Sequence, residues 1–144
     1  MIDNNLKYVR EELEMTQDEL GLVFGVKGVT VAGWENNHDT IPLSKLVKYS
    51  NTYGYSLDYL TGLSRKNDYK GKFDKIDKIK LGKKLKQIRN EFKLSQQEIA
   101  DECKISQSTY SGYETGQYLV TSFVLYIICK NHNLSMDNII KQVK

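Results

Sequence analysis

The sequence has little of several features that mark specialised classes of protein. One of its 144 residues is proline and ten are glycine, which excludes a collagen-like or low-complexity chain. Its two cysteines, Cys103 and Cys129, are too few for a disulfide scaffold and are not spaced as a metal-binding pair. No apolar run approaches the roughly 18 residues of a transmembrane helix, and the polar, acidic start of the chain does not resemble a secretory signal. We therefore expect a cytoplasmic protein without membrane association, whose thiols are buried and unpaired.

Residue groups typical of enzymes and metal sites are missing as well. The sequence has no glycine-rich phosphate loop, no histidine beside a nucleophile at a telling spacing and no recognisable carboxylate pair. His38 and His132 lie far apart and have no cysteine or acidic partner at ligand spacing. We predict no enzymatic activity, no cofactor and no metal ion.

The charge is weak overall but unevenly distributed. The net charge is +3, from 21 Lys and Arg and 18 Asp and Glu. Residues 1–63 carry five basic and nine acidic side chains, residues 64–80 carry seven and three, and residues 81–144 carry nine and six. The two halves are therefore expected to differ as binders of a polyanion, with the second half the better one.

What the sequence does contain is a repeat. A shift of 79 positions places residues 6–61 on residues 85–140 without a gap. Among the identical pairs are Arg10 and Arg89, Gln17 and Gln96, Glu19 and Glu98, Thr30 and Thr109, Gly33 and Gly112, and Glu35 and Glu114. We interpret the chain as two homologous domains, residues 1–63 and 78–144. The polar, basic linker 64–77 between them is either a solvated tether or a phosphate contact.

Each domain is predicted to contain five helices, because apolar residues recur at helical spacing and no stretch alternates with a period of two. Thr16–Glu19 and Ser95–Glu98 are capping boxes, which predict the start of the second helix in each domain. Ser106 is a good N-cap for the third helix of the second domain, whereas Lys27 occupies this position in the first domain and is a poor one.

This pattern resembles the Cro and phage-repressor type of helix-turn-helix domain, the xenobiotic-response-element-like family. The resemblance is carried by TQDELG, FGV and VAGWEN within residues 16–36, and by SQQEIA and ISQSTYSGYETG within residues 95–116. Residues 53–62 also look like the family's last helices. The resemblance implies an all-α chain of two tandem five-helix lambda-repressor-like helix-turn-helix domains. It also implies that each third helix enters the major groove of double-stranded DNA.

The second domain has the better set of candidate readers. Gln107, Ser108 and Ser111 occupy outward positions of its third helix, and a glutamine amide can donate to and accept from an adenine edge. The resemblance adds the glutamine that starts the second helix and the loop after the third. The predicted DNA-binding residues of this domain are Gln96, Ser106, Gln107, Ser108, Ser111, Thr115 and Gln117.

The first domain has fewer polar side chains at the same positions. Its candidate DNA-binding residues are Gln17, Lys27, Thr30 and Asn36, and the glycines of its third helix weaken that helix by about 1 kcal/mol each. This domain either contacts DNA through these residues or serves dimerisation or the binding of another protein.

Two further pairs are interpreted as structural. The family resemblance predicts ion pairs of Arg10 with Glu35 and of Arg89 with Glu114, with unrelated surface charges as the alternative. Trp34 and Tyr113 are expected in the core of their own domains.

The predicted function is that of a sequence-specific DNA-binding transcriptional regulator, a repressor of bacterial or phage type. We expect a homodimer that reads a palindrome, with one chain on an asymmetric site as the alternative. The alternative function is a protein-binding module on the same fold, such as an antitoxin, an anti-defence protein or an anti-repressor.

Overall fold

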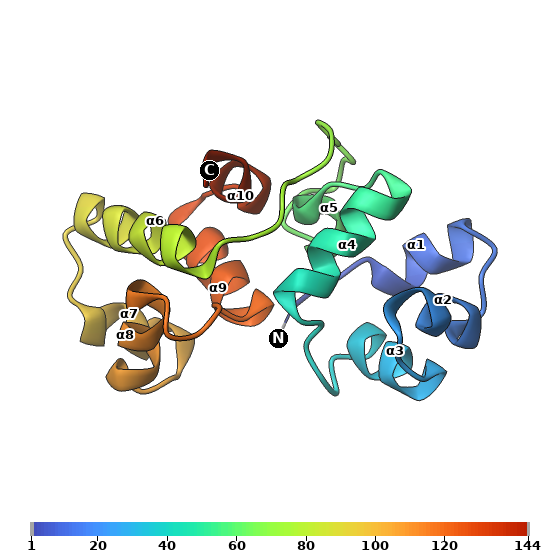
Figure 1. Ribbon diagram of the computed structural model, residues 1–144, viewed down its shortest axis with the longest axis horizontal. Coiled ribbons are helices and arrows are strands. Elements are labelled where there is room, and N and C mark those ends of the chain that lie inside the picture. Colours follow the sequence, from blue (N-terminus) through green and yellow to red (C-terminus); the bar gives the residue numbers. More distant parts are fainter. Residues whose placement is uncertain (1, 144) are drawn as a thin grey trace. The chain divides into compact units, whose positions relative to one another are not determined.

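The computed structural model describes residues 2–143, and every regular element within them is a helix (Figure 1). The chain divides into two compact units, Met1–Lys72 and Phe73–Lys144. The first contains α1 (Leu6–Glu12), α2 (Gln17–Phe24), α3 (Gly28–Glu35), α4 (Leu43–Tyr53) and α5 (Leu57–Thr61). The second contains α6 (Lys78–Glu91), α7 (Gln96–Cys103), α8 (Gln107–Thr115), α9 (Ser122–His132) and α10 (Met136–Gln142). These helices confirm the predicted all-α fold with five helices in each half.

Both predicted capping boxes are present, and they fix the starts of α2 and α7. The Thr16 hydroxyl accepts from the Glu19 amide at 3.0 Å, and the Glu19 carboxylate accepts from the Thr16 amide at 2.9 Å. Ser95 and Glu98 make the same two bonds, both at 3.0 Å. Each box satisfies backbone donors that a helix start leaves without a partner, which stabilises the helix by about 1 kcal/mol.

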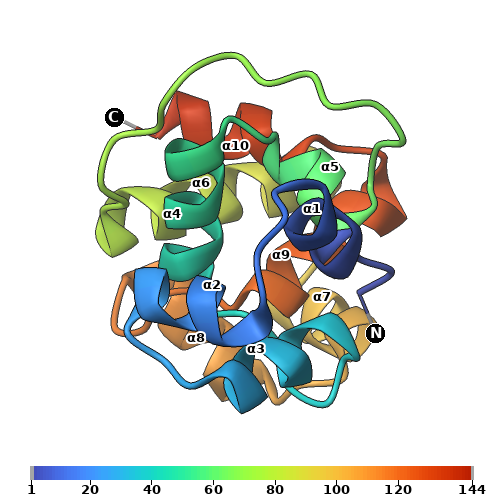
Figure 2. The ribbon, with the colours of Figure 1, turned by 90° about the vertical axis from the view of Figure 1, so that its right-hand side faces the viewer.

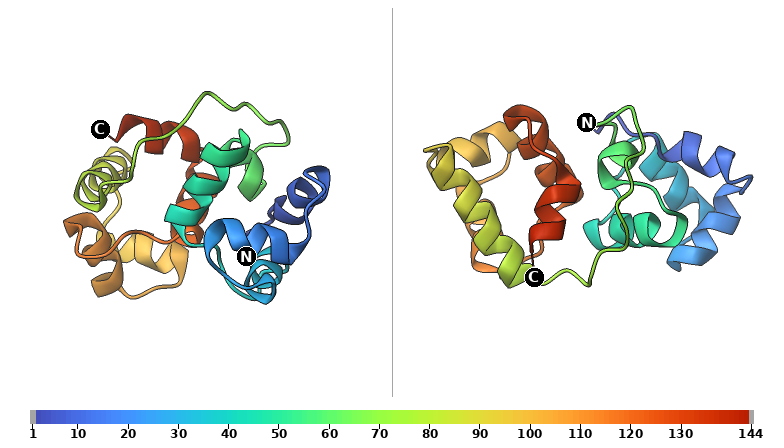
Figure 3. Two further views of the ribbon diagram at one scale, coloured as in Figure 1. Left: turned by 45° about the vertical axis from the view of Figure 1, so that its right-hand side comes forward. Right: turned by 90° about the horizontal axis from the view of Figure 1, so that it is seen from above.

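The turn after each of these helices requires a left-handed residue. Gly25 ends α2 with φ 68°, and Lys104 ends α7 with φ 57°. A residue with a Cβ is strained in this conformation, so the second unit forms the turn at a cost that glycine avoids in the first. The turn leaves α2 packed on α3 and α7 packed on α8 (Figure 2, Figure 3).

Each unit has a core of its own. Trp34 is 4% exposed and meets Phe24 edge to face, with ring centroids 5.8 Å apart. Tyr113 is 7% exposed and meets Tyr110 in the same way, at 6.4 Å. Both rings therefore lie in the core, as predicted. Both cysteines are buried and neither forms a disulfide among the described residues, which also agrees with the prediction.

The two ends of the predicted linker, residues 64–77, are each packed against the unit that they adjoin. The Asn67 side chain accepts from the Ser56 amide at 2.7 Å and donates to the Gly54 carbonyl at 3.1 Å. Phe73 is 8% exposed, and the Lys141 ammonium lies 5.3 Å from the centre of its ring. The division between the two units falls inside the predicted linker. None of the helices within residues 2–143 is long and apolar enough to cross a membrane.

Candidate nucleic-acid interface

A buried ion pair joins the first and third helices of each unit. The Arg89 guanidinium donates to both carboxylate oxygens of Glu114, at 2.6 and 3.1 Å, and to the Leu94 carbonyl at 2.9 Å. Arg10 donates to Glu35 at 2.7 and 3.1 Å in the same geometry. The predicted pairs are therefore confirmed, and they hold the third helix to the first.

The second unit extends this pair into a chain of polar side chains. The Gln96 amide donates to Glu114 at 3.0 Å, and its carbonyl oxygen accepts from the Gln107 amide at 2.7 Å. Burial opposes the charge on Glu114, but the bonds from Arg89 and Gln96 outweigh it and hold the pKa of the carboxyl below its ordinary value. Gln107, at the start of α8, is thus positioned by a bonded series that begins in the core.

Small hydroxyl groups surround the start of α8. The Ser106 hydroxyl accepts from the Thr109 amide at 3.1 Å and lies 3.2 Å from the Ser108 hydroxyl. Ser106, Gln107 and Ser108 are exposed, and Ser111 is half-buried one turn further on. The sequence-predicted residues of this unit therefore share the exposed side of α7 and α8. Their binding of DNA stays a prediction.

The loop after α8 places an aromatic ring on the same helix. Tyr118 is 52% exposed, and its amide donates to the Gly112 carbonyl at 3.2 Å. A Cβ at Gly112 would collide with the Tyr118 ring, so the glycine lets the ring pack closely against α8. Thr115 and Gln117 are exposed beside it, and Gln117 donates to the Tyr118 hydroxyl at 3.3 Å. The family resemblance places the loop from Thr115 to Tyr118 near the phosphates, but it does not indicate that the Tyr118 ring packs on Gly112. A glycine followed six residues later by an aromatic residue is the only sequence signal of that contact.

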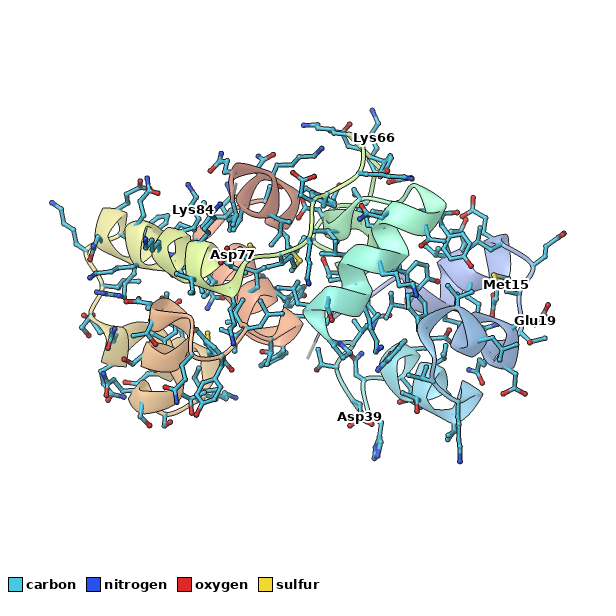
Figure 4. The ribbon with its side chains drawn as sticks, viewed as in Figure 1. Met15, Glu19, Asp39, Lys66, Asp77 and Lys84 are labelled. Atoms are coloured by element: carbon cyan, nitrogen blue, oxygen red, sulfur yellow. The ribbon has the colours of Figure 1, made fainter. Side chains whose placement is uncertain are left out.

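The first unit keeps the glutamine of this series but has different residues at the start of its third helix and in the loop that follows. Gln17 donates to Glu35 at 3.1 Å, but the residue that corresponds to Gln107 is Gly28, so the bonded series stops there. A Cβ at Gly28 would collide with the Asp18 carboxylate, which therefore covers the start of α3. Asp39 takes the place of Tyr118: its amide bonds to the Gly33 carbonyl at 3.1 Å, and it lies in the loop after α3 (Figure 4).

The remaining candidates of the first unit are scattered by comparison. Lys27 is exposed and makes no capping bond from its side chain, and Thr30 is half-buried. Asn36 is exposed, and its side-chain oxygen accepts from the His38 amide at 2.9 Å. Between them lies Val29, which is 75% exposed. Both pairs of helices expose carboxylates, among them Asp18 on α2 and Asp101 on α7, but only α2 and α3 also expose large apolar side chains.

Comparison with known proteins agrees with the duplicated geometry. The helix-turn-helix family HTH_3 matches the chain twice, over residues 6–60 and 85–139. No curated protein matches the chain. Among solved structures, the restriction-modification controller protein C.AhdI from Aeromonas hydrophila is 25% identical over 41% of this chain and 89% of that chain, with a TM-score of 0.39. The clp gene regulator ClgR from Corynebacterium glutamicum is 23% identical over 44% of this chain and 68% of that chain, with a TM-score of 0.42.

Proposed function

The chain belongs to the helix-turn-helix family over both of its units, and on that premise we propose that it is a sequence-specific repressor of transcription that reads DNA through its second unit. It acts in the cytoplasm of a bacterium or on behalf of a phage. In this proposal α8 enters the major groove, with Gln107 and Ser108 at base edges and the loop from Thr115 to Gln117 near the phosphates.

The observation that carries this proposal is the bonded series from Arg89 through Glu114 and Gln96 to Gln107. A flexible glutamine loses rotamer entropy when it binds a base, and this loss weakens binding. The 2.7 Å bond from Gln107 to Gln96 removes part of that freedom before DNA arrives. The first unit offers no such series, because Gly28 stands where Gln107 would be.

Selection from a random duplex library tests the proposal. The parent protein should enrich one sequence, and Gln107→Ala together with Ser108→Ala should weaken binding to it by about 1–3 kcal/mol per lost base contact. Thr52→Ala is the control, because Thr52 is an exposed, uncharged residue of α4 that takes no part in either proposed interface. If no sequence is enriched over bulk DNA at physiological salt, the protein is not a sequence-specific regulator.

We propose a second role for the first unit, the binding of protein and foremost of a second copy of this chain. Leu22 is 83% exposed and Val29 75% exposed, next to the Asp18 carboxylate on the same two helices. A carboxylate at this place repels phosphates, whereas exposed apolar side chains favour a protein surface. In the second unit Asp101 and Ser108 replace Leu22 and Val29, so the apolar feature belongs to the first unit alone.

Sedimentation and footprinting on one sample test this second role. The proposed homodimer should protect a palindrome, and Leu22→Lys should convert it to monomer while the matched change Asp101→Lys should not. A monomeric chain on an asymmetric site would contradict the dimer. A monomer that co-purifies with one stoichiometric protein, and whose DNA binding is weak and insensitive to salt, would favour an antitoxin, anti-defence or anti-repressor role instead.

A further inference from the structure

The first helix of the second unit is longer than its counterpart. Helix α1 begins at Leu6, which corresponds to Leu85, but α6 already begins at Lys78. The carboxylate of Asp77 caps this earlier start by accepting from the Ile79 and Lys80 amides at 2.9 and 3.1 Å. The added two turns lie outside the region that matches the helix-turn-helix family, which begins at residue 85.

The added turns pack against the end of α8. A Cβ at Gly82 would collide with the carbonyl oxygens of Tyr113 and Glu114, so this glycine allows the two helices to approach closely. Ile79 lies against Gly116 in the loop that follows α8, and 52% of its side chain stays exposed. The start of α6 is thus fixed beside the same loop that carries Gln117 and Tyr118.

Helical geometry sorts the lysines of α6 into two groups. An α-helix turns by about 100° per residue. Lys86 and Lys83 therefore lie about 40° and 100° around α6 from Gly82, the residue that packs against α8. Lys80 and Lys84 each lie about 160° from Gly82, on the side away from α8. Lys83 and Lys86 are both exposed, and no carboxylate among residues 2–143 lies within ion-pair distance of either.

Lys80 and Lys84 occupy the other side of α6. Lys84 lines a hollow together with Asn133, in the turn after α9, and Ile139 of α10. In Figure 4 the labelled Lys84 lies on the side of α6 away from α7 and α8. The single helix therefore holds two pairs of lysines of equal charge but different orientation.

The exposed lysines Lys83 and Lys86 form a positive edge along α6, and this edge is specific to the second unit. A further exposed lysine, Lys93, lies in the turn before α7. The corresponding residues of the first unit are Asn4 for Lys83, Lys7 for Lys86 and Glu14 for Lys93. The Lys7 ammonium lies 4.0 Å from the Glu11 carboxylate, so the pair as a whole attracts a distant anion only weakly. The same edge is thus cationic in one unit and close to neutral in the other.

We propose that Lys83 and Lys86 contact the phosphate backbone of DNA beside the groove that α8 enters, an inference that rests on the proposed function. An ammonium group is a compact point charge that binds phosphate oxygens. The contact is independent of base sequence, so it supplies affinity and orientation rather than specificity. It extends the interface of the second unit beyond the helix-turn-helix itself.

A salt titration on a short DNA duplex of mixed sequence tests this inference. The parent and the variants Lys83→Gln with Lys86→Gln, and Lys80→Gln with Lys84→Gln, are compared between about 0.05 and 0.2 M salt. Each double variant removes two positive charges from α6, and glutamine has nearly the same helix propensity as lysine. Circular dichroism establishes that both variants keep the helical content of the parent.

Loss of Lys83 and Lys86 should lower the slope of log affinity against log salt by about 1.8, and the affinity by about 30-fold at 0.15 M salt, because each phosphate contact contributes about 0.9 to the slope. The pair Lys80 and Lys84 should change the slope by much less. Equal effects of the two pairs would mean a general charge effect and would overturn the inference, as would a slope unchanged by Lys83 and Lys86. The salt titration uses a duplex of mixed sequence and not the sequence enriched from the random library. A library selection that enriches no sequence would therefore refute the proposed function without deciding this inference.

Discussion

Removal of the Glu114 carboxylate should destabilise the second unit and leave the first intact. The side chains of Glu114 and Arg89 are 3% and 12% exposed, so Glu114→Ala leaves a buried guanidinium without its counter-charge. It also removes the acceptor of Gln96. Loss of one partner from a buried ion pair costs about 3–5 kcal/mol.

That cost is large against the stability of so small a unit. A domain of the size of Phe73–Lys144 has a free energy of unfolding of about 4–11 kcal/mol, at about 0.05–0.15 kcal/mol per residue. We therefore expect Glu114→Ala to remove a large share of the free energy of unfolding of the second unit. The first unit has a separate core and should keep its stability.

Urea denaturation followed by two signals distinguishes the units. The chain has one tryptophan, Trp34, which lies in the core of the first unit, so its fluorescence reports on that unit alone. Far-ultraviolet circular dichroism reports on both. Glu114→Ala should add an early transition to the dichroism and leave the fluorescence midpoint unchanged, whereas Glu35→Ala should shift the fluorescence midpoint.

Two results would refute this reasoning. A dichroism transition that is unchanged in Glu114→Ala would mean that the pair contributes little to folding. A fluorescence midpoint that falls together with the dichroism would mean that the two units do not unfold independently. Replacing both partners, as in Arg89→Met with Glu114→Leu, should recover most of the lost stability, because no buried charge is then left without a partner.

Three further predictions concern single side chains. Trp34→Ala and Tyr113→Ala should each destabilise their own unit by about 3–5 kcal/mol, measured by denaturation, and a variant that melts like the parent would place its ring outside the core. Lys104→Gly should raise the stability of the second unit by about 1 kcal/mol, because it relieves a left-handed residue at φ 57°; a lower melting temperature would contradict the strain. The pKa of Glu114 is lowered in the folded chain, so its stabilising contribution is present above its unfolded pKa, near 4.5, and is lost as the pH falls through the lower folded value. Glu114→Gln should therefore flatten the loss of stability below pH 4.5 or so, and equal acid dependence of parent and variant would argue against that shift.

The helices could be predicted from the sequence because their signals are local. Capping boxes such as Thr16–Glu19 and turn residues such as Gly25 act within a few positions of the chain, so a one-dimensional pattern contains them. The two buried ion pairs join positions 25 apart, and only the duplicated sequence and the family resemblance pointed to them.

The covering of the third helices could not be predicted in this way. Tyr118 lies on Gly112 and Asp18 lies on Gly28 because a loop and a neighbouring helix bring them there. In each case the sequence shows only a residue without a side chain and does not show what fills the space. A glycine in a helix reads as a weak point of that helix until the side chain that needs the space is known. The bond between Gln96 and Gln107 was missed for the same reason, since it depends on the packing of α7 against α8.

The contact of Asp18 with Gly28 makes the divergence of the two copies difficult to reverse. Suppose that the two copies began alike and that the first unit then lost a glutamine at position 28. One substitution could restore that glutamine only while the residue at position 18 left space for it. With Asp18 over the helix start, any side chain at position 28 meets that carboxylate, and the second unit has Gln97 at the corresponding place. Restoration of the glutamine then requires the Asp18 side chain to move, so its effect depends on which residue stands at position 18. A duplicated module that acquires such a contact is held in its new role by epistasis, even when nothing selects against the old one.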